Sequence, residues 1–240
     1  MMRGHRRTWL AEAADWCRAA RDMTAAGLSL LRRQLAADRA SGPNPRPAPV
    51  IIIPGVLEPW RYLLPLGRYL QQQGHAVHYV KRLGFNLRPF DASADEVLQL
   101  AAAEGLEGAV IVGHSKGGII GKLALLRDDE RRFSGMVTVA TPFAGSGLAA
   151  PLQRLPWAGR TPLANLFVGS EQLALIAAET RVNARITSLA PKWDQVVDRE
   201  STRLPGARLI DLERGGHFAP MRDESVWRII ADEIRRLTST

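Results

Sequence analysis

The sequence predicts an α/β fold, a mostly parallel sheet with helices on both faces, with a helical extension at the N-terminus. From residue 50 onward, short apolar runs rich in β-branched residues alternate with longer amphipathic segments, as in repeated β-α units. A glycine-rich turn at residues 113–118 joins one such run to one such segment. The 240 residues, 46% of them hydrophobic, are enough to bury a large core.

The expected elements follow from apolar periodicity and from strand length. Residues 109–112 are a short run of apolar, mostly β-branched residues, which predicts a buried strand. Further strands are expected at residues 50–53, 75–80, 136–140, 186–190 and 207–212, and helices at residues 62–73, 94–103, 118–127 and 225–237.

Residues 1–49 are expected to form an extension that precedes the main domain, residues 50–240. Apolar residues at helical spacing within 1–40 predict one or two amphipathic helices, hinged near Gly27. A proline at every second position from Pro43 to Pro49 predicts an extended spacer. We favour a helix packed on the main domain. The alternative is a weak membrane-surface contact through residues 1–40.

Residues 144–185 interrupt the alternation of strands and helices. The segment is too long for an ordinary connection, and it contains leucines, Trp157, Phe167 and three prolines. Long insertions of this kind are usually lids or caps over a site. We therefore expect a lid insertion here, with an ordinary helical excursion as the alternative.

Composition narrows the partners and the compartment. The net charge of +8 is spread along the chain without a long basic block, so no nucleic-acid partner is expected. No stretch approaches the ~20 apolar residues of a membrane span. The single Cys17 forms no intrachain disulfide, and no zinc-ligand spacing occurs. We expect no metal or cofactor, and a cytoplasmic location, with peripheral membrane association as the alternative.

The glycine-rich turn has the pattern G-x-S-x-G at Gly113, Ser115 and Gly117. Between a strand and a helix, this pattern predicts a tight turn that exposes the Ser115 hydroxyl as a nucleophile. The plain alternative is a glycine-rich turn with an incidental serine. His114, at the variable position of the pattern, is expected to point away from Ser115.

A base and an acid are expected at the carboxyl ends of later strands. His217 lies in a glycine-rich loop after the last expected strand, and it is the candidate base. Asp194 follows the strand at 186–190 and is the candidate acid, because Val196 and Val197 can anchor its loop. Asp198 is the next candidate, and Asp211, inside a strand, is the third.

An oxyanion hole requires two backbone N–H groups near the nucleophile. The residue after Ser115 supplies one, the N–H of Lys116, and the turn Pro54-Gly55-Val56 supplies the N–H of Val56. The side chain of Lys116 is expected to be a solvated cation.

These residues resemble the serine lipase/esterase branch of the α/β-hydrolase superfamily over about residues 50–240. The resemblance is carried by IIIPGVLEP, VGHSKGG, VTVATPFAGSGLA, KWDQVV and GGHFAP, in the family's order. Phe143 stands where a histidine commonly follows Thr-Pro, and Pro54-Gly55 replaces the His-Gly of many lipases. No cluster matches the calcium site of some bacterial lipases.

The resemblance implies hydrolysis of carboxylic esters through a Ser-His-Asp triad and an acyl-enzyme. The expected partner is a small-molecule ester with a hydrophobic acyl or alcohol group. Acyltransferase, thioesterase or phospholipase chemistry on the same residues and a non-catalytic binding member of the fold remain alternatives. Because residues 1–49 supply none of the candidate groups, deleting them should leave turnover of soluble esters within a few-fold, unless the helix covers core surface.

Overall fold

The structure is a computed structural model, and it describes residues 3–28, 47–146, 166 and 168–239. Six strands form one parallel sheet in the order β2-β1-β3-β4-β5-β6. The prediction of a mostly parallel α/β fold is therefore confirmed. The strands are β1 (Val50–Ile53), β2 (Val77–Tyr79), β3 (Ala109–His114), β4 (Phe133–Val139), β5 (Ile186–Ala190) and β6 (Arg208–Asp211).

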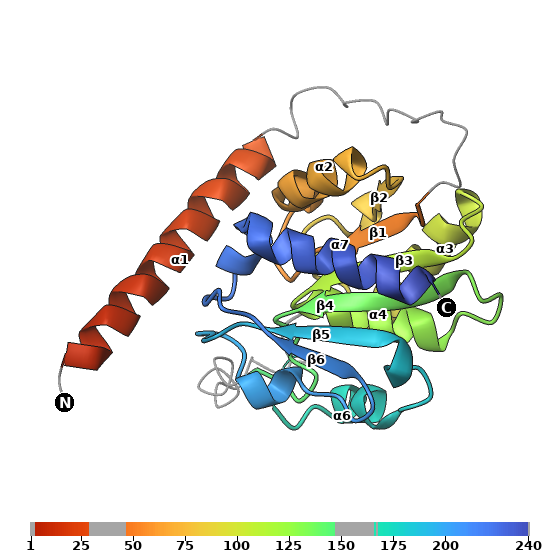
Figure 1. The fold of residues 1–240 in the computed structure, drawn as a ribbon. Helices are drawn as coiled ribbons and strands as arrows, with labels where there is room; N and C mark the ends of the chain where they lie inside the picture. The colour runs from red at the N-terminus through yellow and green to blue at the C-terminus, as the bar shows by residue number, and fades with distance from the viewer. Residues whose placement is uncertain (1–2, 29–46, 147–165, 167, 240) are drawn as a thin grey trace.

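Helices cover both faces of this sheet (Figure 1). Alternate residues of each central strand point to opposite faces, so Ile51 and Ile111 join one core cluster while Ile52 and Val110 join the other. The first cluster includes α3 (Phe90–Ala103), α4 (Lys116–Leu126) and α6 (Glu171–Ala178), and the second includes α1 (Arg3–Leu28), α2 (Leu64–Gln72) and α7 (Glu224–Thr238).

The predicted elements differ from the observed ones mainly at their ends. The helix after the glycine-rich turn begins at Lys116 instead of residue 118, and the segment predicted as one helix at 62–73 begins as the 3-10 turn η2 (Trp60–Leu63) before α2. Four more 3-10 turns lie in loops: η3 (Lys81–Leu83), η7 (Asn183–Arg185), η8 (Arg199–Thr202) and η9 (Ala219–Arg222).

The helix α1 lies beside the loops that follow β5 and β6 (Figure 1). Asp15 and Ala19 are buried against the main domain, and Trp16 packs edge-on against Phe218, with ring centroids 5.0 Å apart. The condition under which deletion of residues 1–49 was expected to be tolerated is therefore not met, because α1 covers core surface. No helix in the part of the chain that the structure describes is long and apolar enough to cross a bilayer.

Two predicted segments fall partly outside the described residues. The proline spacer is described only from Pro47, and about half of the predicted lid, at 147–165 and 167, is not described. Of the described part of that insertion, α6 packs Leu173 and Ile176 into the core on the α3–α4 face.

The chain reverses its direction of winding at β1, because β2 lies on one side of that strand and β3 on the other. In open parallel sheets, ligands bind beyond the carboxyl ends of the strands at such a switch point. Here the turn after β1 begins at Pro54, and the turn after β3 holds Ser115.

Candidate active site

Ser115 occupies a strained turn between β3 and α4. Its backbone has φ 51° and ψ −123°, which places a non-glycine residue at positive φ. Strain of this kind costs about 1–3 kcal/mol and persists only where the surroundings enforce it. The N–H of Ser115 donates to the carbonyl of Val139 on β4, at 2.9 Å, and this bond ties the turn to the neighbouring strand.

Two glycines make this turn sterically possible. A Cβ on Gly113 would lie 2.6 Å from the amide nitrogen of Gly118, and a Cβ on Gly117 would lie 2.3 Å from the carbonyl oxygen of Ile53. Both contacts are with backbone, which cannot move aside as a flexible side chain can. The G-x-S-x-G spacing therefore has a steric cause in this fold.

The structure brings His217 and Asp194 together from the loops after β6 and β5. The Nδ1 atom of His217 lies 2.9 Å from Oδ2 of Asp194, and both side chains are almost completely buried. A carboxylate oxygen accepts hydrogen bonds, so Nδ1 donates, and Nε2 of a neutral imidazole is then left as an acceptor.

The carboxylate of Asp194 is itself fixed by backbone groups. Its Oδ1 accepts hydrogen bonds from the N–H groups of Val196, at 2.7 Å, and Val197, at 2.9 Å. A carboxylate held in this way can orient an imidazole, because it cannot rotate without losing two hydrogen bonds.

The other two acidic candidates do not face His217. Asp198 is exposed and precedes η8. Asp211 is exposed and binds the guanidinium of Arg199, with Oδ1 2.9 Å from Nε and Oδ2 2.7 Å from Nη2, and this hydrogen-bonded pairing lowers the pKa of Asp211. Of the three candidates, Asp194 is the one whose carboxylate lies within hydrogen-bonding distance of the His217 imidazole.

His114, the residue before Ser115, connects the turn that holds Ser115 to the loop that holds His217. In the part of the chain described, no hydrogen bond joins the Ser115 hydroxyl to His217. The neighbouring His114 reaches the loop instead, with Nε2 3.0 Å from the carbonyl oxygen of His217 and the two rings 5.0 Å apart. Ser115 and His217 are both buried, with 6% and 3% of their surfaces exposed.

The turn after β1 packs directly on the turn that holds Ser115. A Cβ on Gly55 would lie 3.2 Å from Cβ of Ser115, so glycine allows the backbone of this turn to come close to the serine. The N–H of Gly55 donates to Oε2 of Glu58 at 2.6 Å, and no hydrogen bond among the described residues uses the N–H of Val56. The N–H of Lys116 lies in the first turn of α4, where amide groups have no partner within the helix.

The expectation of a solvated Lys116 side chain is wrong. The side chain is buried, and Nζ donates to the carbonyl oxygens of Asn86, at 2.8 Å, and Arg88, at 2.6 Å. Burial lowers the pKa of Lys116 to about 8. The lysine thus connects the turn that holds Ser115 to the loop between η3 and α3, and its ammonium is buried rather than solvated.

Sequence reasoning missed a buried pair beside Ser115, formed by Glu58 and His114. Nδ1 of His114 lies 2.8 Å from Oε1 and 2.9 Å from Oε2 of Glu58, and neither side chain is exposed by more than 1%. Burial opposes a charge on His114, but the Glu58 carboxylate and the hydrogen bonds outweigh it and raise the pKa of the imidazole. The His114 ring is thus held between Glu58 and the carbonyl of His217.

The available signal for that pair was weak. Glu58 follows Gly55 by three residues, and His114 directly precedes Ser115, so each was next to a predicted feature. Nothing in the spacing shows that the two side chains meet, because they are 56 residues apart. Among the described residues, no group of three or more His, Cys, Asp or Glu side chains is arranged to hold a metal ion.

Comparison with known proteins gives a fold and no close relative. The sequence matches no protein-family model and no curated protein. Among solved structures, the mature lipase BlEst2 of Bacillus licheniformis superposes with a TM-score of 0.70 at 16% identity, over 83% of this chain and 97% of that one.

Two other solved structures have the same arrangement. A monoacylglycerol lipase of Paleococcus ferrophilus matches with a TM-score of 0.58 at 16% identity, over 81% of this chain and 96% of that one. The carboxylesterase CesB of Bacillus subtilis matches with a TM-score of 0.54 at 14% identity, over 92% and 98%. Identities this low are evidence of common architecture alone. With its six parallel strands, its covering helices and these neighbours, the chain has the α/β-hydrolase fold.

Proposed function

We propose that this protein is a serine hydrolase that cleaves carboxylic esters, with Ser115 as nucleophile, His217 as base and Asp194 as the orienting acid. One observation carries the proposal. Ser115, held at positive φ at the carboxyl end of β3, directly follows His114, whose Nε2 lies 3.0 Å from the carbonyl oxygen of His217, and His217 forms a buried pair with Asp194, 2.9 Å between Nδ1 and Oδ2. The solved structures of similar fold include lipases and esterases, which adds support.

In the proposed acylation step, Nε2 of His217 takes the proton of Ser115 as Oγ attacks the ester carbonyl. Asp194 holds the imidazole in the tautomer with Nδ1 protonated and stabilises the imidazolium that forms. The alcohol leaves with the proton returned by His217, and the acyl group stays on Ser115. Water then attacks the acyl-serine by the same route in reverse, which releases the acid and the free serine.

The negative charge on the attacked oxygen needs donors, and the N–H groups of Val56 and Lys116 are proposed for it. The close approach of Gly55 to Ser115 supports this placement, as does the lack of another described hydrogen bond for the Val56 N–H. Removing one such donor typically costs about 10²–10³-fold in turnover.

The proposed substrate is a small ester with a hydrophobic acyl or alcohol group. Three apolar side chains beside the candidate site remain exposed: Leu57 by 54%, Phe85 by 49% and Leu87 by 41%. Leu57 directly follows Val56, and its N–H donates to the carbonyl of Phe85 at 2.8 Å, which joins the two loops that carry these residues. An apolar rim of this kind favours an apolar substrate.

The proposed function is tested with a fluorophosphonate probe and a panel of p-nitrophenyl esters of graded chain length. The probe should label the wild-type protein at Ser115, and Ser115→Ala should lose labelling and about 10⁴-fold or more in turnover. Ser134→Ala is the matched control, since the Ser134 hydroxyl binds the carbonyl of Gly108 near the amino ends of β3 and β4. A wild type that neither reacts nor turns over any ester would identify a non-catalytic member of the fold.

The same experiment separates hydrolysis from acyl transfer. Adding an alcohol acceptor should leave free acid as the main product of an esterase, whereas an acyltransferase would form mainly the new ester. Thioester and phospholipid substrates in the panel distinguish the thioesterase and phospholipase alternatives.

A further inference from the structure

The helix α1 supplies a buried carboxylate to the loop that holds His217. Asp15 is 2% exposed, although it belongs to a segment that precedes the sheet. Its Oδ2 accepts a hydrogen bond from the backbone N–H of Phe218, the residue after His217, at 3.1 Å. A Cβ on Gly216 would lie 2.9 Å from Cγ of Asp15, so the carboxylate also lies against the residue before His217.

The same carboxylate reaches His217 by a second route. Oδ2 of Asp15 accepts from the side-chain amide of Gln195 at 2.8 Å, and the amide oxygen of Gln195 accepts from the N–H of His217 at 3.1 Å. Because an ionised carboxylate accepts only, it fixes which end of the Gln195 amide faces His217. Gln195 directly follows Asp194, so this chain of bonds spans both partners of the His–Asp pair.

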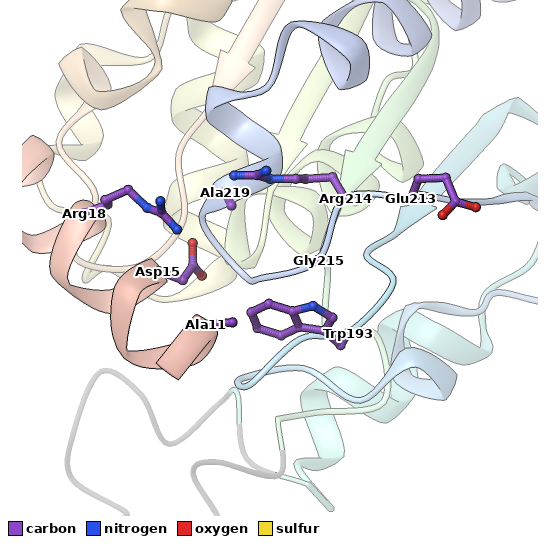
Figure 2. Close-up of a pocket in the computed structure, with 8 residues that line it drawn as sticks. All are labelled: Ala11, Asp15, Arg18, Trp193, Glu213, Arg214, Gly215 and Ala219. Atoms are coloured by element: carbon purple, nitrogen blue, oxygen red, sulfur yellow. The ribbon is translucent and has the colours of Figure 1, made fainter. Parts of the chain in front are cut away.

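Side chains do not completely fill the space between α1 and these loops. A cavity of about 230 Å³ lies between α1 and the loops after β5 and β6, lined by residues that include Asp15, Trp193, Arg214 and Gly215. Figure 2 shows Asp15 and Arg18 of α1 facing Ala219, Gly215 and Trp193. Residues 216–221 are themselves buried, so the hydrogen bonds of Asp15 act together with packing to position the loop.

We propose that Asp15 is a positioning residue for His217, acting through the Phe218 N–H and the Gln195 amide, and that α1 is part of the catalytic apparatus. The inference rests on the proposed ester hydrolase function. Asp15 touches neither the substrate nor the reacting atoms. It restrains the backbone on both sides of His217, so that Nδ1 stays on Asp194 and the ring keeps the orientation that the proposed proton transfer requires.

The test is a set of variants in the full-length protein, with kcat and KM measured on a soluble p-nitrophenyl ester. In Asp15→Ala both hydrogen bonds are lost, and kcat should fall about 10- to 100-fold with KM within about twofold, since small displacements of a catalytic group cost this much. In Asp15→Asn the amide oxygen can still accept, so the loss of kcat should be smaller. Asp22→Ala is the matched control, because Asp22 on α1 contacts Arg222, 3.4 Å away, and not the His217 loop.

Two further measurements distinguish the positioning role of Asp15 from a merely structural one. The downfield proton resonance of His217 Nδ1–H should broaden or shift in Asp15→Ala and stay unchanged in Asp22→Ala. If Asp15 acts through Gln195, the double variant Asp15→Asn/Gln195→Ala should lose less kcat than the product of the two single losses.

The outcomes are distinguishable from failure of the proposed function. The wild type is first labelled with the fluorophosphonate and assayed, and a wild type without either activity would overturn the proposed function itself. If the wild type is active and Asp15→Asn and Asp15→Ala keep wild-type kcat and the same Nδ1–H resonance, the positioning role is overturned. Equal loss in Asp22→Ala, or independent effects of Asp15 and Gln195, would also overturn it.

Discussion

The imidazole of His114 and the carboxylate of Glu58 form a buried pair, with Nδ1 2.8 Å from Oε1. The other ring nitrogen, Nε2, faces the carbonyl of His217 at 3.0 Å and must therefore donate. Glu58 also accepts from the N–H of Gly55 at 2.6 Å. One pair of side chains thus connects the turn after β1, the turn that holds Ser115 and the loop that holds His217.

We expect the pair to stabilise the fold, and the loss of stability should depend on which residue replaces Glu58. Glu58→Leu leaves the His114 ring and the Gly55 N–H without an acceptor, and it should lower the free energy of unfolding by about 3–5 kcal/mol. Glu58→Gln should cost only about 1–2 kcal/mol, because its amide can donate to a neutral His114 and accept from Gly55. Urea unfolding at constant pH measures both values.

The pH dependence of the free energy of unfolding tests the contribution of the Glu58–His114 pair independently. The pKa of His114 is raised in the folded state, so the stability it contributes is present below its unfolded pKa, 6.5, and is lost as pH rises through the folded pKa. This loss should vanish in Glu58→Gln. Glu104→Gln should change stability by less than about 1 kcal/mol, because the Glu104 carboxylate is 48% exposed and 3.8 Å from His78. Equal effects at Glu58 and Glu104 would contradict the prediction.

Asp194 should be distinguishable from the other two acids by activity. Asp194→Asn is expected to reduce kcat/KM by about 10⁴-fold, because the amide favours the wrong tautomer of His217. Asp198→Asn and Asp211→Asn should stay within a few-fold, since both side chains are exposed and Asp211 is paired with Arg199. Ester hydrolysis at saturating and limiting substrate measures the three variants, and a large loss at Asp198 would reassign the acid.

Gly117→Ala should damage the nucleophile turn. The new Cβ would lie 2.3 Å from the carbonyl oxygen of Ile53 and 2.7 Å from that of Pro54, which forces backbone shifts between β1 and α4. We expect a loss of about 1–3 kcal/mol in stability together with a lower kcat, because the turn that carries Val56 moves away from Ser115.

Gly121→Ala is the control in the same helix. Its Cβ would meet the terminal methyl group of the flexible Met136, at 2.8 Å, and the Cγ2 methyl group of Ile111, at 2.9 Å, so it crowds core side chains and not the backbone of the turn that holds Ser115. The free energy of unfolding and kcat are measured for both variants. Full activity in Gly117→Ala would show that the close approach of β1 to α4 is not needed.

Lys122 should make stability increase with pH. The side chain is completely buried on α4, with Nζ 3.3 Å from the carbonyl oxygen of Ala177, and burial lowers its pKa from 10.5 to about 8 despite the nearby Glu179. Between these two pKa values the unfolded state binds more protons, so the free energy of unfolding rises with pH, by up to about 1.4 kcal/mol per pH unit.

Lys122→Met should remove this contribution. We expect the variant to be more stable than the wild type at pH 7 and to have a shallower rise between pH 8 and 10 in urea unfolding. A residual rise should remain from Lys116, whose pKa is also lowered to about 8. A wild type whose stability is flat over this range would refute the assignment. Measurements stop at pH 10 because Tyr79, with a pKa raised to about 12, acts in the opposite direction above it.

The fold could be predicted from the sequence because local patterns determine it. Residues 50–53 are an apolar run and residues 186–190 are small and apolar residues with Thr187 and Ser188 among them; both segments are buried, and each forms a strand with the predicted bounds. The placements of Ser115, Asp194 and His217 after strands of a parallel sheet also follow from pattern and order, and the pairing of Asp194 with His217 agrees with the sequence preference for that acid.

The remaining features depend on contacts between distant residues. Lys116 reads as a surface cation, yet the carbonyl groups of Asn86 and Arg88, about thirty residues away, surround its ammonium. Glu58 and His114 meet only after β1 and β3 pair. In the sequence, Asp15 is one of several charged residues in a predicted amphipathic helix. The spacing of these residues does not show which acidic side chain becomes buried.

The hydrogen bond between Asp15 and Phe218 joins positions 203 residues apart, and this separation affects how the protein is made. During synthesis, α1 is complete long before the loop that Asp15 binds. Until that loop is added, the helix has no surface on which to pack. Its apolar face, including Ala19 and Met23, is exposed to other chains during that interval. A contact between residues so far apart in sequence is expected to form late in folding. We therefore expect activity to appear late in refolding, after the sheet has formed.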